Sequence, residues 1–311
     1  MTTSARPTPI CSATSRGGEP PAGRSCSSAG VRKYIARTTP ALSENTLYVA
    51  AGYTLLAVDA ETGSARWSVP LRFAGSCSPV VDGDRVYVAT QEGHISAFST
   101  ETGAEVWHYR NDNLLFGSPA VSGGVVVIVD EAGVVTAIDA LSGRELWQRT
   151  AGGEAFTTPA IAKGVAFVAT NAPSLSAFDL KTGTQLWQRD IGGESSPAAT
   201  DGVVFLGGDD QSVRAVDSAT GETRWSSPLG YVIRSSVTFA DDGVYIGSGP
   251  TVTAIDRRDG STLWTHVTGG AVTADVAVVG GGLIASSQDG YVYFLGPSEQ
   301  SPSETDGSMD S

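Results

Sequence analysis

The sequence predicts an all-β fold, a β-propeller of seven blades with four strands each. Six tryptophans recur at intervals of 38 to 40 residues, and a glycine lies four residues before each of them. A fixed period near 40 residues indicates a repeat architecture, and radial repetition of four-stranded sheets is typical of propellers. No repeat keeps an apolar stripe at helical spacing over three turns, which argues against amphipathic helices. The six tryptophans are Trp67, Trp107, Trp147, Trp187, Trp225 and Trp264.

A short motif marks the third and fourth strands expected in each unit. Residues 177–187 read Ala-Phe-Asp-Leu-Lys-Thr-Gly-Thr-Gln-Leu-Trp, and the pattern Ala-x-Asp-x-x-Thr/Ser-Gly-x-x-x-Trp returns with small changes at six places. A carboxylate or hydroxyl before a tight turn accepts hydrogen bonds from the backbone of that turn, so we interpret this position as a turn cap and not as a catalytic base. Five units carry Asp59, Asp139, Asp179, Asp217 and Asp256, and the second unit has Ser99.

The second unit shows the expected strand plan most clearly. Residues 78–81 form a first strand and 85–90 a second, separated by an Asp-Gly-Asp turn. Residues 94–99 form a third strand and 104–110 a fourth, and glycines in the intervening turns supply the positive φ that tight hairpins need. Apolar, β-branched second strands such as 125–129 are typical of strands buried on both faces.

The two ends of the chain are expected to complement each other. The last unit stops at residues 288–295 without a Gly-x-x-x-Trp segment, whereas Val31–Ile35 forms an additional strand before the first unit. We therefore expect 31–35 to supply the missing outer strand of the seventh blade and close the ring, unlike a solenoid, which needs capping repeats. This gives a flexible leader at 1–30, a single domain at 31–296 and a disordered acidic tail at 297–311.

Composition excludes several classes of function. The net charge is −13 with only three lysines, so nucleic acid is not expected as a partner. The acidic, lysine-poor surface fits either a protein of high-salt conditions or a coding bias toward arginine. No run approaches 18 apolar residues, so we expect no membrane span, and the first 30 residues lack the apolar run of a signal peptide. Three cysteines, distant and odd in number, form no disulfide framework.

The repeated motif resembles the tryptophan-docking motif of propeller repeats of the pyrroloquinoline-quinone (PQQ) type. Such repeats occur in quinoprotein alcohol dehydrogenases and in the propeller lipoprotein that helps assemble outer-membrane barrels, and the resemblance covers about residues 38–295. It implies that each tryptophan packs between blades, against the alanine of its motif and the glycine turn of the next blade. It also implies an extracytoplasmic or cell-envelope location.

The resemblance allows an alternative reading as a PQQ- and calcium-dependent oxidoreductase. Enzymes of this family place a tryptophan under the quinone ring and a pair of adjacent cysteines over it. They also hold calcium on insertions between the blades. Here all six tryptophans occupy docking positions, and Cys11, Cys26 and Cys77 are not adjacent. We therefore expect no catalytic residue, no PQQ and no metal ion. The histidines, His94, His108 and His266, are expected at surface edges of strands.

The preferred reading is a monomeric, non-enzymatic module that binds a protein or a peptide. Function is expected on the connections between blades, which share one face with the turns between second and third strands. Aromatic and arginine residues there are typical interface anchors, although they could instead plug the central channel or be solvated. Two alternatives remain: the protein could bind a peptide as an added strand at an exposed blade edge, or it could act as a sensor of a small ligand. The candidate residues are Arg72, Phe73, Asp112, Asn113, Phe116, Glu154, Phe156, Glu194, Tyr231, Arg234 and Asp275.

Overall fold

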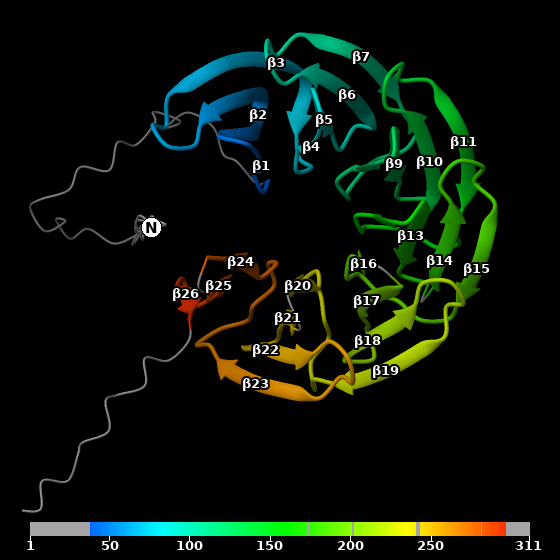
Figure 1. Ribbon diagram of the computed structural model, residues 1–311, viewed down its shortest axis with the longest axis vertical. Coiled ribbons are helices and arrows are strands. Elements are labelled where there is room, and N and C mark those ends of the chain that lie inside the picture. The colour runs from blue at the N-terminus through cyan, green and yellow to red at the C-terminus, as the bar shows by residue number, and fades with distance from the viewer. Residues whose placement is uncertain (1–37, 173, 201, 241–242, 281, 297–311) are drawn as a thin grey trace, which may run out of the picture.

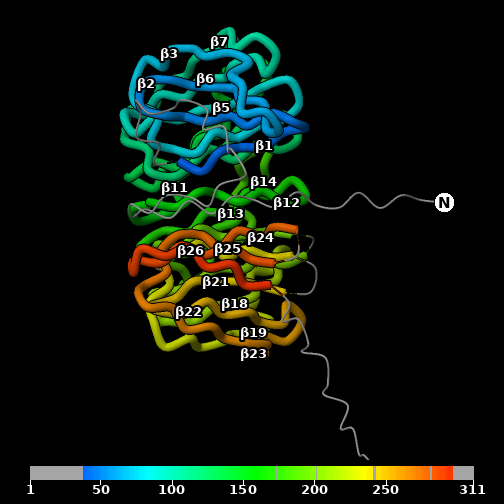
Figure 2. Tube along the Cα trace, turned by 90° about the vertical axis from the view of Figure 1, so that its left-hand side faces the viewer, coloured from blue at the N-terminus to red at the C-terminus, as the bar shows by residue number. Residues whose placement is uncertain are grey.

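The computed structural model confirms the all-β, seven-bladed propeller. It describes residues 38–172, 174–200, 202–240, 243–280 and 282–296, and these contain strands and no helix. Seven antiparallel sheets are arranged around a central axis, each with its first strand innermost (Figure 1). Seen at right angles, the ring has two opposite faces, which carry the turns and connections between strands (Figure 2).

Blades two to six each contain four strands in sequence order, because each consecutive pair is joined by a short turn. Blade two contains β4 (Val80–Asp82), β5 (Arg85–Ala89), β6 (His94–Ser99) and β7 (Glu105–Arg110), and blade three contains β8 (Ala120–Ser122), β9 (Val125–Val129), β10 (Val134–Asp139) and β11 (Glu145–Thr150). Blade four contains β12 (Ala160–Ala162), β13 (Val165–Thr170), β14 (Ser174–Asp179) and β15 (Gln185–Arg189). Blades five and six contain β16 (Ala198–Thr200), β17 (Val203–Gly207), β18 (Ser212–Asp217), β19 (Thr223–Pro228), β20 (Thr238–Ala240), β21 (Gly243–Ser248), β22 (Thr251–Asp256) and β23 (Thr262–Val267).

The first and seventh sheets differ from this plan. Blade one contains β1 (Ala41–Ser43), β2 (Thr46–Asp59) and β3 (Ala65–Gly75), since β2 runs through both the second and third strand positions. Blade seven contains β24 (Ala277–Val279), β25 (Gly282–Ser286) and β26 (Val292–Leu295), three strands within the described residues. The segment expected to complete it, Val31–Ile35, lies outside the described residues, as do 1–30 and 297–311.

The core lies between blades. One cluster joins Val127 and Val129 of β9 to Val168 of β13 and Phe178 of β14, all at most 1% exposed. Every residue of β9 is buried, as a strand covered by sheets on both sides requires. Burial of this apolar surface between neighbouring sheets stabilises the ring, at roughly 25 cal/mol per Å² removed from water.

The tryptophans lie at these seams between blades. In strand register Trp147 opposes Ala137 of its own blade, and a Cβ added at Gly183 of the next blade would lie 2.5 Å from its ring. Its Nε1–H donates to the Leu180 carbonyl at 3.0 Å. The equivalent donations run from Trp67 to Thr100, Trp107 to Ala140, Trp187 to Ser218 and Trp225 to Arg257, at 2.9 to 3.1 Å.

Trp264 differs from the other five because the seventh blade has no Gly-x-x-x-Trp turn to receive it. Its ring is 39% exposed, and no acceptor for its N–H is present in the described part of the chain. The described residues of blade seven contain three strands, and none of them is a fourth, outer strand.

Serine and threonine side chains at the starts of the inner strands link successive blades, and we call this set the inner belt. Backbone N–H groups donate to the next blade's hydroxyl from Thr39 to Ser78, Ser78 to Ser118, Ser118 to Thr158 and Thr158 to Ser196, at 2.9 to 3.0 Å. Between blades five and six, Ser195 Oγ donates to the Ser235 carbonyl at 2.9 Å. Between blades six and seven, the Ser236 N–H donates to Asp275 Oδ1 at 2.6 Å.

Candidate partner-binding face

One face of the ring gathers the connections between blades and the turns between second and third strands, and we call it the connection face. The two kinds of loop are tied together by backbone hydrogen bonds, for example from Leu115 N–H to the Gln91 carbonyl at 3.0 Å. Another such bond runs from Asn171 N–H to the Glu154 carbonyl at 2.9 Å. Loops bonded in this way present their side chains on a rigid scaffold.

Four candidate residues occupy equivalent positions of successive blades on this face. Each lies two residues before a serine or threonine, which itself lies two residues before the inner strand, so all four lie near the inner edge of the ring. We call them the mouth arc, because the inner strands that follow them surround the axis of the ring (Figure 1). The mouth arc consists of Phe116, Phe156, Glu194 and Arg234.

The mouth arc has an apolar half and a charged half. The rings of Phe116 and Phe156 meet edge to face with centroids 5.1 Å apart, and each side chain remains 40% exposed. Further round the arc, Arg234 Nη1 lies 2.7 Å from Glu194 Oε2 across the seam between blades five and six. Both charged side chains are largely exposed, so this ion pair adds at most about 1 kcal/mol to stability. Two large aromatic rings open to solvent at one place offer an apolar contact surface.

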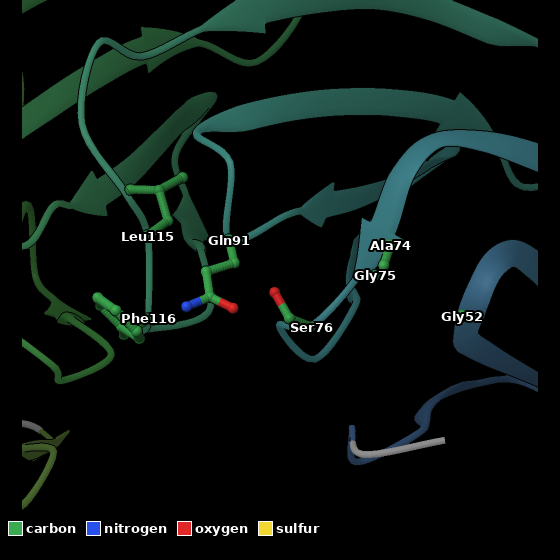
Figure 3. A pocket seen from close by; sticks show the side chains of 7 residues that line it. All are labelled: Gly52, Ala74, Gly75, Ser76, Gln91, Leu115 and Phe116. Carbon is green, nitrogen blue, oxygen red and sulfur yellow. The ribbon is translucent and has the colours of Figure 1, made fainter. Parts of the chain in front are cut away.

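A cavity of about 480 Å³ adjoins the apolar half, between blades one and two. Figure 3 shows the Gln91 amide and the Ser76 hydroxyl pointing toward each other across it, with Phe116 on the far wall. The Gln91 amide makes no hydrogen bond within the part of the chain that the structure describes. The remaining lining residues, Gly52, Ala74, Gly75 and Leu115, are uncharged, so the cavity suits a neutral group that forms hydrogen bonds.

Two candidate residues lie on an outer strand and not in a connection. Arg72 and Phe73 belong to β3, which is longer than the other outer strands and reaches blade two through a bridge between Gly75 and Thr90. Arg72 Nη2 lies 3.1 Å from Glu105 Oε2. The Phe73 ring stacks on His94 with centroids 4.0 Å apart. Both therefore lie at the outer seam of blades one and two, away from the mouth arc.

Two further candidates support the loops themselves. The Asn113 amide donates to Asp130 Oδ2 at 2.9 Å, and Asp130 is 1% exposed. Asn111 donates to the same oxygen at 3.0 Å, while Ala132 N–H and Val134 N–H donate to Oδ1. A buried carboxylate needs such partners, so Asn113 satisfies Asp130 and holds the connection.

The remaining candidates are spread around the face. Asp112 and Glu154 are exposed in their connections, and Glu154 Oε2 accepts from the Asn171 amide at 3.0 Å. Tyr231 is 46% exposed and its ring lies against the Gly249 turn. Asp275 accepts the belt hydrogen bond of Ser236, so its carboxylate holds blades six and seven together.

Ser76 and Gln91 are not among the residues predicted from the sequence. Ser76 occupies the position of the mouth arc in blade two, two residues before Ser78, so the repeat spacing marks it. Gln91 lies in a turn between middle strands, where no repeated residue type marks it. The Gln91 carbonyl accepts a hydrogen bond from Leu115 N–H, and this contact holds the turn beside the cavity.

Comparison with known protein families identifies the repeats. The family described as outer membrane protein assembly factor BamB matches residues 19–117, 112–229 and 209–299, which together span most of the chain. The chain belongs to this family. No curated protein sequence matches it.

Solved structures share the propeller of the BamB family. The crystal structure of BamB from Moraxella catarrhalis is similar, with a TM-score of 0.73 and 22% identity over 85% of this chain and 86% of that one. A computationally designed protein, Ika8, is similar with a TM-score of 0.57 and 18% identity over 85% of this chain and 97% of that one. At these identities the likeness extends to the fold.

The residues on the connection face do not fit a bound quinone. Five tryptophans are engaged at seams between blades, with their N–H groups on backbone carbonyls, and Trp264 lies on the outer strand β23. The cavity is lined by no tryptophan and by no charged side chain that could hold the carboxylates of PQQ. In the described ranges, no group of three or more His, Cys, Asp or Glu could hold a metal ion. The same ranges contain no helix that is long and apolar enough to span a bilayer.

Proposed function

We propose that the chain is a non-enzymatic binding module that takes a protein or peptide segment on its connection face. The observation that carries this proposal is the mouth arc, where Phe116 and Phe156 form an exposed aromatic pair and the Glu194–Arg234 ion pair lies further round. Binding energy concentrates in a few aromatic and arginine anchors surrounded by polar groups. The family description, an outer membrane protein assembly factor, supports a partner that is itself a protein.

The charges at the mouth arc favour a segment with an apolar centre and mixed polar flanks. The aromatic pair takes the apolar centre, and Glu194 and Arg234 offer one acceptor and one donor group further round the arc. Exposed charges of this kind set orientation and association rate more than affinity. We propose a monomer in an extracytoplasmic location, as the family description supports, with neither PQQ nor a calcium ion as a cofactor.

The test uses a peptide selected on the protein from a phage-displayed random library. Its affinity is measured by titration calorimetry for wild type, for a Phe116→Ser/Phe156→Ser variant and for a Leu146→Ser/Leu186→Ser control. The control removes two exposed apolar side chains from outer strands, 45% and 49% exposed, where no binding is proposed. We expect the mouth variant to lose at least about tenfold in affinity, or about 1.4 kcal/mol. Equal loss in both variants, or loss in the control alone, would refute the proposal.

The quinone alternative makes a different prediction. A ligand at 100 times its Kd stabilises a fold by about 2.7 kcal/mol, a clear rise in melting temperature. We expect PQQ with Ca²⁺ to leave the melting temperature unchanged. A rise that needs both components would favour the oxidoreductase instead.

The cavity beside Phe116 supports a second candidate function, a sensor for a small neutral ligand. Its volume of about 480 Å³ and the exposed Gln91 amide at its edge fit a ligand that forms hydrogen bonds without charge. Melting the protein with a panel of neutral sugars and amides tests this function. A shift abolished by Gln91→Ala, with peptide affinity unchanged, would favour the sensor.

A further inference from the structure

Two histidines face each other on the outer half of blade two. His94 begins β6 and His108 lies on β7, where the strand register pairs His94 with Arg110 and Ser96 with His108. The two histidines are thus diagonal neighbours across one strand pair. His94 Nδ1 lies 2.7 Å from His108 Nε2, and the rings are stacked with centroids 5.0 Å apart.

We propose that His94 and His108 together bind one divalent transition-metal ion of the class that prefers imidazole, such as Cu²⁺, Ni²⁺ or Zn²⁺. Metal–imidazole bonds of about 2.0–2.1 Å place two neighbouring ligand nitrogens roughly 3 Å apart at the right angles that Cu²⁺ and Ni²⁺ prefer, and roughly 3.3 Å apart in the tetrahedral geometry of Zn²⁺. The two nitrogens share a hydrogen bond at 2.7 Å, within a few tenths of an ångström of the first value, and a bound ion would take the place of its proton. Imidazole ligands select these metals over Mg²⁺ and Ca²⁺, which prefer oxygen.

The protonation of the pair suits metal binding at neutral pH. Burial lowers the pKa of His94, and the neighbouring His108 and Arg110 lower it further. Burial also lowers the pKa of His108, with a smaller contribution from Arg72. Both rings are therefore neutral near pH 7, and a tautomer exists in which both facing nitrogens carry lone pairs.

The surroundings hold the pair in place and moderate its charge. The Phe73 ring packs on His94 at a centroid distance of 4.0 Å, which fixes the orientation of the imidazole. Glu105 pairs with Arg72 through Oε2, so that cation is partly neutralised. The negative field of Glu92 partly offsets that of Arg110 at His94. Water would complete the coordination sphere, since two protein ligands leave positions open.

Titration calorimetry of the untagged protein with NiCl₂, ZnCl₂ and CuCl₂ at about pH 7.5 tests the site, because imidazole is then neutral. We expect one ion per chain, with MgCl₂ giving no binding heat. His94→Gln and His108→Gln should each lower affinity at least tenfold. His266→Gln is the matched control, since it removes the third histidine from β23, and it should bind as wild type does.

A spectroscopic measurement on the wild-type protein tests the site without relying on the variants to fold. The spectrum of bound Cu²⁺ in electron paramagnetic resonance should show coupling to two imidazole nitrogens. Coupling to a single nitrogen, unchanged affinity in both variants, or no saturable binding of any of the three metals would overturn the proposal.

Discussion

At the scale of single residues, each docked tryptophan closes one seam between blades. Trp147 is 6% exposed, its N–H is bonded to Leu180, and its ring covers Gly183 of the next blade. Such an indole buries on the order of 200 Å² and requires one acceptor, and both requirements are met here.

Replacing Trp147 with alanine should therefore destabilise the fold by about 3–5 kcal/mol, since it removes a buried aromatic side chain and leaves a cavity. Trp264→Ala is the matched control, because that ring is 39% exposed and covers no glycine turn in the described residues. Urea unfolding of the two variants should show a clearly lower midpoint for Trp147→Ala. Equal midpoints would contradict the docking role.

The aspartates that cap five of the six motif turns make stability depend on pH. Asp217 Oδ2 lies 2.6 Å from Arg224, and Oδ1 accepts from the Ala219 and Thr220 N–H groups. The Arg224 hydrogen bond, and then the backbone of Thr220, lower the pKa of Asp217 to about 2. The ordinary value is about 3.9, so the folded state binds a proton less readily than the unfolded chain. This stabilisation is complete above about pH 4 and is lost as the pH falls through about 2.

Asp217→Asn should accordingly lower the melting temperature near neutral pH, and the difference from wild type should shrink as the pH falls from about 4 to 2. Melting curves at a series of pH values measure it. A difference that stays constant over this range would show that the carboxylate charge has no such role.

At the scale of the structural element, the motif glycine meets two requirements at once. Gly183 has a φ of 67°, which side chains rarely adopt, and a Cβ there would lie 2.5 Å from Trp147. Gly123 has a similar φ of 58°, but no atom lies within 4 Å of an added Cβ. Comparing substitutions at these two glycines therefore distinguishes the cost of backbone strain from the cost of a steric clash with the tryptophan.

Gly183→Ala should thus destabilise the protein more than Gly123→Ala. The Gly123 variant has only the backbone strain, about 1 kcal/mol, whereas the Gly183 variant also clashes with Trp147. Chemical unfolding of both variants gives the comparison. If the two variants unfold at the same denaturant concentration, the close approach of the tryptophan does not limit this position.

The sequence predicted the strands and blades, but it did not predict how much of the candidate binding face is arranged. The motif from Ala177 to Trp187 repeats because every seam needs the same small residue, turn and indole, so periodicity predicted seven blades. Phe73 could not be placed, since β3 extends across the seam by pairing Gly75 with Thr90, and only tertiary packing brings its ring to His94. The belt role of Asp275 was hidden for a related reason, because its partner Ser236 lies 39 residues away.

At the scale of the whole molecule, the seventh blade presents an exposed apolar surface within the described residues. Val292 and Phe294 of β26 are 68% and 61% exposed, and Trp264 on β23 of blade six is 39% exposed. The first blade, by contrast, is joined to the second through both Trp67 and the inner belt. Closure by residues 31–35, which lie outside the described residues, stays a prediction.

Removal of residues 1–36 should then lower the melting temperature sharply, because a propeller depends on a closed ring to protect its strand edges. Removal of 297–311 is the control and should leave the melting curve unchanged. An unchanged curve after removal of 1–36 would rule out closure by this segment.

The most direct test of the proposed binding face is hydrogen–deuterium exchange of the intact protein with and without the selected peptide. Bound peptide should slow exchange in the connections that carry the mouth arc, around Phe116, Phe156, Glu194 and Arg234. Exchange along β26, the outermost strand of blade seven in the described residues, should be unaffected. Protection confined to β26, with the mouth arc unchanged, would contradict the account and assign binding to strand addition at that edge.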